Sequence, residues 1–161
     1  MPRRLLPFVP GRLSVVGVEP VADQLVVRVA LRPAPTHCPG CQTPSRRHHG
    51  RYERTLADLP WQGRPVRLRL QLRRFRCPNP PCPRRTFGEN VADVVRSHAR
   101  RSERLRDLQR HLGLALGVEP AARLARRLEM PVSGDTLLRL VRAAPLPVRP
   151  EPRVVGIDEW A

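Results

Sequence analysis

The chain has four cysteines, in two close pairs. Cys38 and Cys41 have two residues between them, Cys77 and Cys82 have four, and 35 residues separate the pairs. Each pair with its intervening residues is called a knuckle here. Two such knuckles can offer four thiolates to one tetrahedral Zn²⁺. Because four sulfurs leave no coordination position for water, the spacing predicts structural rather than catalytic zinc. The alternative is four unrelated buried cysteines, which the double pairing disfavours.

Three histidines, His37, His48 and His49, lie beside the first knuckle and are alternative metal ligands. With four cysteines present, we expect them to be loop residues, and His48 and His49 to be candidates for phosphate contact.

The charge of the chain is strongly positive, with a formal net charge of +16 and no lysine among its basic residues. Residues 46–110 hold 18 arginines and six acidic residues, a net charge of +12. Such concentrated charge attracts phosphate backbones and releases their counterions. An anionic membrane surface is the alternative partner. The sequence has no long apolar run, signal peptide or lipidation motif, so we expect no membrane partner and a cytoplasmic location.

The N-terminal part is predicted to be β-structure around the knuckles. Residues 13–32 form two apolar runs with turn residues at 19–24, which predicts a hairpin. A short strand is expected at 51–55 and a turn at 58–63. Hairpin, knuckle, strands and second knuckle together predict a small β-rich zinc ribbon, with Phe87 covering its core.

Residues 66–73 give the clearest period of two, with Val66, Leu68, Leu70 and Leu72 alternating with polar residues. Such a strand buries its aliphatic face and exposes a row of arginines. Phe75 breaks the alternation, so a bulge is expected near residues 73–74.

From about Ser97 the period becomes helical. The first predicted helix buries Leu105, Leu108 and Leu112 and ends at Gly113 or Gly117. A second helix has Pro120 in its first turn. Its expected packing residues are Ala121, Ala122, Leu124, Ala125 and Leu128.

Residues 129–132 are a predicted turn, and Ser133 is a predicted N-cap with Asp135 in the first turn of a third helix. That helix is expected to reach about Ala143. Its expected buried residues are Leu137, Leu138, Leu140 and Val141. Two short helices joined by a tight turn form a helix-turn-helix pattern, for which a plain three-helix bundle is the alternative.

The arginines of the strand and the second knuckle are predicted to grip phosphates, while the third helix reads bases in the major groove. A solvated charged face is the alternative for the arginines of the strand. The predicted DNA-binding residues are Arg67, Arg69, Arg73, Arg74, Arg76, Arg84, Arg85, Arg123, Arg126, Arg127, Ser133, Thr136, Arg139 and Arg142.

A proline-rich linker at 145–153 is followed by an apolar run at 154–161 that ends in acidic residues. We expect a buried strand here, with Asp158 at its tip. One carboxylate is too few for two-metal chemistry.

The order of these features resembles the ISL-three family of bacterial insertion-sequence transposases. The matching stretches are Cys38–Cys41, Arg51–Pro60, Arg73–Cys77, Cys82–Phe87, Ser133–Arg139 and Val155–Trp160. In that family a zinc ribbon and a helix-turn-helix precede an RNase-H-like catalytic domain, whose Asp-Asp-Glu triad holds two Mg²⁺ ions. The resemblance implies that Asp158 is the first Asp of the triad; the second Asp and the Glu have no counterpart in this chain.

The predicted fold class is therefore α+β: a β-hairpin and four-cysteine zinc ribbon (1–92), a three-helix helix-turn-helix module (93–144), a linker (145–153) and the first strand of a truncated RNase-H-like domain (154–161). The function implied is sequence-specific binding to transposon ends by a catalytically incomplete portion of a transposase. The partners implied are double-stranded DNA with terminal inverted repeats, and a homodimer or the full-length transposase, in a nucleoid-associated location. Zinc is the expected cofactor, and Mg²⁺ only in a full-length homologue. The alternatives are a truncated regulator or competitor of transposition, a decayed gene product, and RNA binding by the ribbon.

Overall fold

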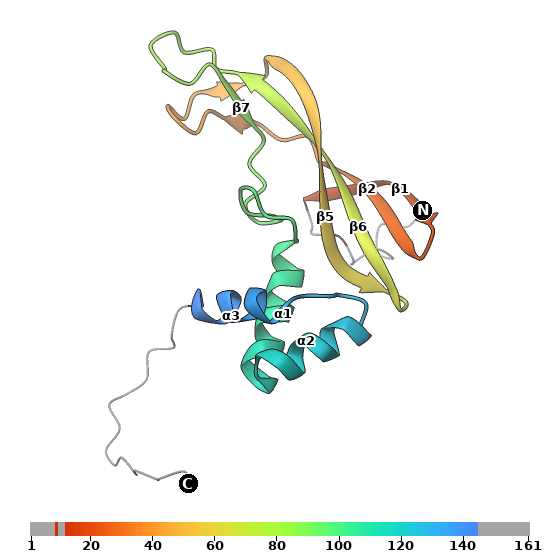
Figure 1. Cartoon of the computed structure of the whole chain (residues 1–161). Coiled ribbons are helices and arrows are strands. Elements are labelled where there is room, and N and C mark those ends of the chain that lie inside the picture. The colour runs from red at the N-terminus through yellow and green to blue at the C-terminus, as the bar shows by residue number, and fades with distance from the viewer. Residues whose placement is uncertain (1–8, 10–11, 145–161) are drawn as a thin grey trace, which may run out of the picture.

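The computed structural model describes residue 9 and residues 12–144 of the 161-residue chain. The linker expected at 145–153 and the strand expected at 154–161, with Asp158, lie outside the described residues. What is described is a mixed α+β structure, with a sheet-rich N-terminal part followed by three helices (Figure 1).

The expected N-terminal hairpin is present. Strand β1 (Leu13–Val21) pairs antiparallel with β2 (Gln24–Leu31). The turn lies at residues 22–23, where Ala22 has a φ of 51°. Val29 is fully buried, as the alternation in the second apolar run predicted, and Leu13 at the start of the first run is nearly so.

Two long strands carry the sheet away from this hairpin. Strand β5 (His48–Trp61) and strand β6 (Arg64–Arg76) form an antiparallel pair that runs from the knuckle end of the sheet down to the helices (Figure 1). The strand expected at 51–55 is therefore much longer. The prediction of a turn at 58–63 is wrong for residues 58–61, which belong to β5. The connecting turn is confined to Gln62 and Gly63, and both have a positive φ. Such a two-residue turn matches the twist of the strands that it joins.

Four strands of the five-stranded sheet have the order β1-β2-β6-β5, and the fifth, β7 (Thr86–Gly88), pairs with β6. Strand β2 runs parallel to β6. The predicted alternation of β6 is confirmed: its four aliphatic residues at 66–72 are buried, and Arg67, Arg69 and Gln71 are exposed. The bulge expected at residues 73–74 lies instead on the opposite strand, where the register shifts between His48 and Gly50.

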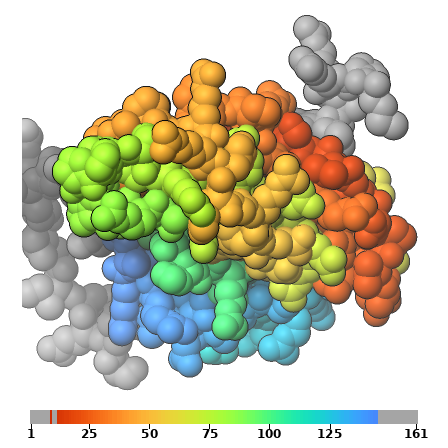
Figure 2. All heavy atoms as spheres, turned by 90° about the horizontal axis from the view of Figure 1, so that it is seen from above, coloured from red at the N-terminus to blue at the C-terminus, as the bar shows by residue number. Residues whose placement is uncertain are grey.

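Short strands hold the knuckles at the far end of the sheet. Strand β3 (Thr36–His37) pairs with β4 (Pro44–Ser45), next to the first knuckle. Strand β7 (Thr86–Gly88) follows the second knuckle and pairs with β6 at residues 74–76. The N-terminal hairpin and the second knuckle lie at opposite ends of the molecule in Figure 2, with the helices along one flank.

Helix α1 (Glu103–Leu116) begins later than expected. Residues 97–101 are not helical because residues 100–102 bond to the edge of β5: Ala57 N donates to Arg100 O at 2.9 Å, and Ser102 N donates to Ala57 O at 3.0 Å. Ser102 is the N-cap, and its hydroxyl accepts a hydrogen bond from Leu105 N. This cap satisfies one of the free N–H groups of the first turn.

The buried face of α1 differs in part from the expectation. Leu105 is buried and Leu112 partly so, but Leu108 is 38% exposed. Gln109 and Gly113 are buried instead. Gly113 allows close approach to α3, since an added Cβ would lie 3.0 Å from Val141 Cγ2. The helix ends at Gly117, one of the two expected positions.

Helices α2 (Val118–Arg127) and α3 (Gly134–Arg142) complete the bundle and begin where the sequence predicted. The alanines expected to pack in α2 are buried, but Leu128 is exposed. Leu137 is the buried residue of α3, and the other three expected core residues, at 138, 140 and 141, are half-buried. Among the described helices, none has the length and apolar character needed to cross a membrane.

Candidate metal centre and basic surfaces

The four cysteines come together at one point, as the spacing predicted. All four Sγ atoms lie within 4.8 Å of one another. Sγ atoms of Cys38 and Cys82 are 3.8 Å apart, and those of Cys41 and Cys77 are 3.6 Å apart. These distances exceed the roughly 2.05 Å of a disulfide. They match the edge of about 3.8 Å that follows from a tetrahedron with Zn–S bonds of about 2.3 Å.

The backbone of each knuckle fixes its cysteines. Cys38 O accepts from Gln42 N at 2.8 Å, and Cys38 N donates to Thr43 O at 3.0 Å, which closes the first knuckle on itself. Gln42 takes the left-handed conformation, with a φ of 59°. The second knuckle is anchored where Cys77 N donates to Arg85 O at 2.9 Å. The thiol positions are thus set by backbone hydrogen bonds as well as by the side chains.

The surroundings shift the pKa values of two of the thiols in opposite directions. Hydrogen bonds from the side chain and backbone of Thr43 lower the pKa of Cys41 from 9.0 to about 6. Burial raises the pKa of Cys77 to about 12. Four thiolates packed this closely repel one another, so a cation must compensate for the deprotonated form. The donor set therefore fits a structural zinc ion.

A small aromatic core covers the cysteine cluster. Phe75 and Phe87 stack with ring centroids 6.0 Å apart, and both are buried with Cys38 and Cys82. Phe87 covers the core as expected. Phe75 leaves the aliphatic alternation of β6 because it faces this second core. His48 packs on Phe75 at 4.9 Å, and His37 and His49 are exposed. The histidines do not belong to the cysteine group.

The arginines predicted on the sheet are for the most part exposed. Arg67, Arg69, Arg74 and Arg76 lie along β6. Arg84 and Arg85 follow Cys82 and are exposed as well. Arg74 lies over the ring of Tyr52 at 5.4 Å.

Arg73 differs from its neighbours on β6 because its guanidinium is engaged inside the fold. It forms an ion pair with the buried carboxylate of Glu89, and Arg73 Nε donates to Glu89 Oε1 at 2.8 Å. Only 22% of the Arg73 side chain is exposed. This arginine joins β6 to the segment after β7.

The predicted residues of the helices lie on their outer faces. Arg123, Arg126 and Arg127 of α2 are exposed, as are Arg139 and Arg142 of α3. The hydroxyl of Ser133 caps α3, accepting from Thr136 N at 3.3 Å. Arg139 is oriented by its own helix, where Nη2 donates to Thr136 Oγ1 at 3.4 Å.

One group of residues important to this arrangement was missed from the sequence. Asp58 is buried in β5, and its carboxylate accepts from Ser102 Oγ at 2.6 Å and from Arg104 Nε at 2.8 Å. Both partners lie at the start of α1. This contact attaches the helices to the sheet. An aspartate followed by Leu-Pro resembles turn chemistry, and no local signal pointed to partners more than 40 residues away.

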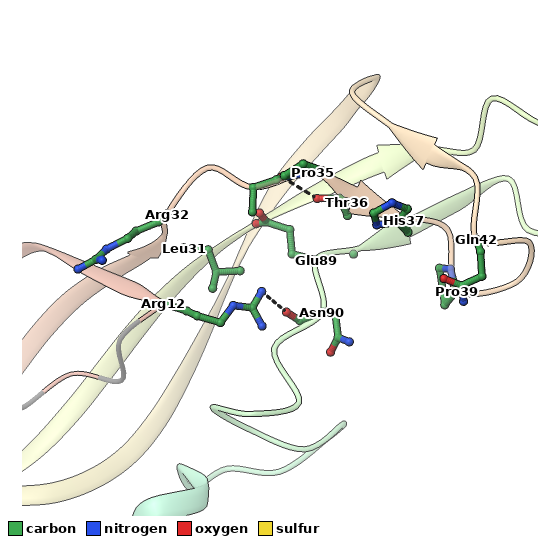
Figure 3. Close-up of a pocket in the computed structure, with 12 residues that line it drawn as sticks. Arg12, Leu31, Arg32, Pro35, Thr36, His37, Pro39, Gln42, Glu89 and Asn90 are labelled. Carbon is green, nitrogen blue, oxygen red and sulfur yellow. Dashed lines mark hydrogen bonds between the residues drawn. The ribbon is translucent and has the colours of Figure 1, made fainter.

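A pocket of about 520 Å³ lies between the N-terminal hairpin, the first knuckle and the segment after β7 (Figure 3). Its charged groups Arg12 and Glu89 already have partners within the fold. Arg12 donates to Asn90 O and to Asp93 Oδ1, and Glu89 holds Arg73. We therefore interpret this pocket as the junction between the ribbon and the sheet.

Comparison with known proteins agrees with the metal centre. Residues 34–82 match the family described as the zinc-finger of transposase IS204/IS1001/IS1096/IS1165. The match begins before the first knuckle and ends at Cys82, the last ligand of the second. Neither the curated proteins nor the solved structures gave a match. The match supports an N-terminal region of the ISL-three transposase type, with structural zinc and a role in DNA binding during transposition.

Proposed function

We propose that this chain binds the terminal inverted repeats of an insertion sequence, as the DNA-recognising N-terminal portion of an ISL-three transposase. The observation that carries the proposal is the family match over the four clustered cysteines. The net charge of +16 is consistent with a polyanionic partner.

In this proposal α2, the turn after it and α3 act as a helix-turn-helix, with α3 in the major groove. Support comes from the cap at Ser133 and from Arg139 and Arg142 on the exposed side of α3. A guanidinium group presented by such a helix can donate two hydrogen bonds to one guanine, at O6 and N7.

The sheet has a different role in the proposal, which is to hold the phosphate backbone. Arg67, Arg69, Arg74 and Arg76 lie on a strand whose end is fixed by the metal centre. Contacts to phosphate position the protein but carry little sequence information. The zinc ion supplies rigidity at that end and takes no part in chemistry.

The test is a selection from random duplexes with zinc-loaded protein, followed by affinity measurements on the selected duplex and a scrambled one. Arg139→Ala should weaken binding to the selected duplex by roughly 10- to 100-fold, the equivalent of about 1–3 kcal/mol for one base contact, with a much smaller effect on the scrambled duplex. Arg123→Ala is the matched control and should weaken both duplexes alike.

An equal loss on both duplexes for Arg139→Ala would reduce that residue to a phosphate contact. A selection that enriches no duplex would contradict sequence-specific recognition altogether.

A further inference from the structure

A cleft of about 500 Å³ separates one end of the sheet from the helical bundle. Its walls come from β6 with Arg67, from the segment before α1 with Arg100 and Arg101, and from the loop between α2 and α3 with Glu129. That loop lies beside the turn of the β5–β6 pair (Figure 1). The cleft thus brings Arg67 together with Arg100 and Arg101, two neighbouring residues from a segment far away in the sequence.

Arg101 is the unusual member of this group. Its backbone is fixed by a parallel bridge to Ala57 at the edge of β5. Its side chain makes no hydrogen bond or ion pair with any residue that the structure describes. Burial and the nearby charge of Arg139 both lower the pKa of Arg101. A half-buried cation beside a second cation is unfavourable unless an anion compensates both.

Two carboxylates line the cleft, and they do not balance its three arginines. Asp58 lines it, but Ser102 and Arg104 occupy its oxygens. Glu129 also lines the cleft and forms no ion pair within the described part of the chain. The cleft therefore keeps more positive charge, from Arg67, Arg100 and Arg101, than the single carboxylate of Glu129 can balance.

We propose that this cleft binds a backbone phosphate of duplex DNA through Arg67, Arg100 and Arg101. Arg67 belongs to the arginine row of β6, and Arg101 lies close enough to Arg139 of α3 for their charges to interact. A phosphate here would continue the path of the backbone from the sheet to α3. Guanidinium groups suit this ligand because they form paired hydrogen bonds to phosphate oxygens. The inference rests on the proposed function and adds Arg100 and Arg101 to the interface.

The test measures the affinity of zinc-loaded Arg101→Ala for a fluorescent duplex of scrambled sequence between about 50 and 200 mM salt. At low salt the affinity should be several-fold lower than that of the parent. In a plot of log affinity against log salt concentration, the magnitude of the slope should be smaller by about 1. Arg101→Lys should retain most of the slope because it keeps the charge. Arg110→Ala is the control: Asp107 already pairs Arg110, at 2.7 Å, so the slope should not change.

Thermal unfolding without DNA separates binding from folding. Because Arg101 has no partner among the described residues, Arg101→Ala should melt at the same temperature as the parent or higher. A lower melting temperature with an unchanged salt slope would make Arg101 a structural residue and overturn the proposal.

Two other outcomes separate this inference from the proposed function. A parent that binds duplex while Arg101→Ala binds equally well, with the same slope, overturns the cleft site alone. A parent that binds no duplex overturns both. Loss of poly-glutamate binding in Arg101→Ala, with duplex binding intact, would assign the cleft to an acidic protein partner and also overturn the proposal.

Discussion

At the scale of single residues, the cysteine cluster is the best-determined feature of the chain. Its ligands could be predicted from the sequence because thiolate chemistry and knuckle spacing are local properties. The same holds for the cap at Ser133, which depends on the residue type beside a helical period. The partners of Arg73 and Asp58 could not be predicted, since each lies in another segment that only the folded chain brings near.

Replacing one ligand tests the metal centre. We expect Cys77→Ser to lose bound zinc and to melt at a lower temperature, because the binding energy of a structural zinc, roughly 10–16 kcal/mol in small zinc domains, is coupled to folding. Zinc content per chain and a thermal melt are the measurements.

His37→Ala serves as the control, since His37 is the exposed histidine next to Cys38. It should keep its zinc. Unchanged zinc content and melting in Cys77→Ser, or loss of zinc in His37→Ala, would contradict the four-cysteine site.

At the scale of elements, the period of the hydrophobic residues predicted which segments are strands and which are helices, but not where each begins and ends. The alternation at 66–72 predicted β6, and the helical periods predicted three helices, since both patterns follow from which side chains face a core. The predicted start of α1 is too early. Residues 100–102 form hydrogen bonds to the edge of β5, which the local pattern could not show. The length of β5 was missed because its polar stretch and Pro60 resemble a loop, while pairing with β6 and burial of Asp58 keep it extended.

Asp58 provides a test of how the helices attach to the sheet. We expect Asp58→Ala to lower the free energy of unfolding by about 2–3 kcal/mol. This is less than the roughly 3–5 kcal/mol of a fully buried pair, because Arg104 keeps 30% of its side chain exposed. Urea unfolding at neutral pH measures the change.

Asp107→Ala is the matched control, since Asp107 is an exposed partner of Arg110. Its loss should cost no more than about 0.5 kcal/mol. Equal effects of the two substitutions would show that the Asp58 network does not hold the helices in place.

At the scale of the whole molecule, the arrangement of charge matters more than its total. The net charge of +16 and its concentration between residues 46 and 110 can be read from the sequence. The sequence could not show that Arg67 on β6 and Arg100 and Arg101 before α1 share one cleft. Which arginines are matched by acids, such as Arg73 with Glu89, was equally invisible. The fold therefore separates structural arginines from those left available to a polyanion.

The central claim is that a zinc-held sheet and a helical bundle together recognise duplex DNA. The most direct measurement compares the affinities of the zinc-loaded chain and the chelator-stripped chain for a selected duplex and a scrambled one at the same salt concentration. We predict that the zinc-loaded chain prefers the selected duplex by about 10³-fold, the lower end for specific binders, and that stripping zinc removes most of this preference. Equal affinity for both duplexes, or a preference that survives the loss of zinc unchanged, would contradict the account.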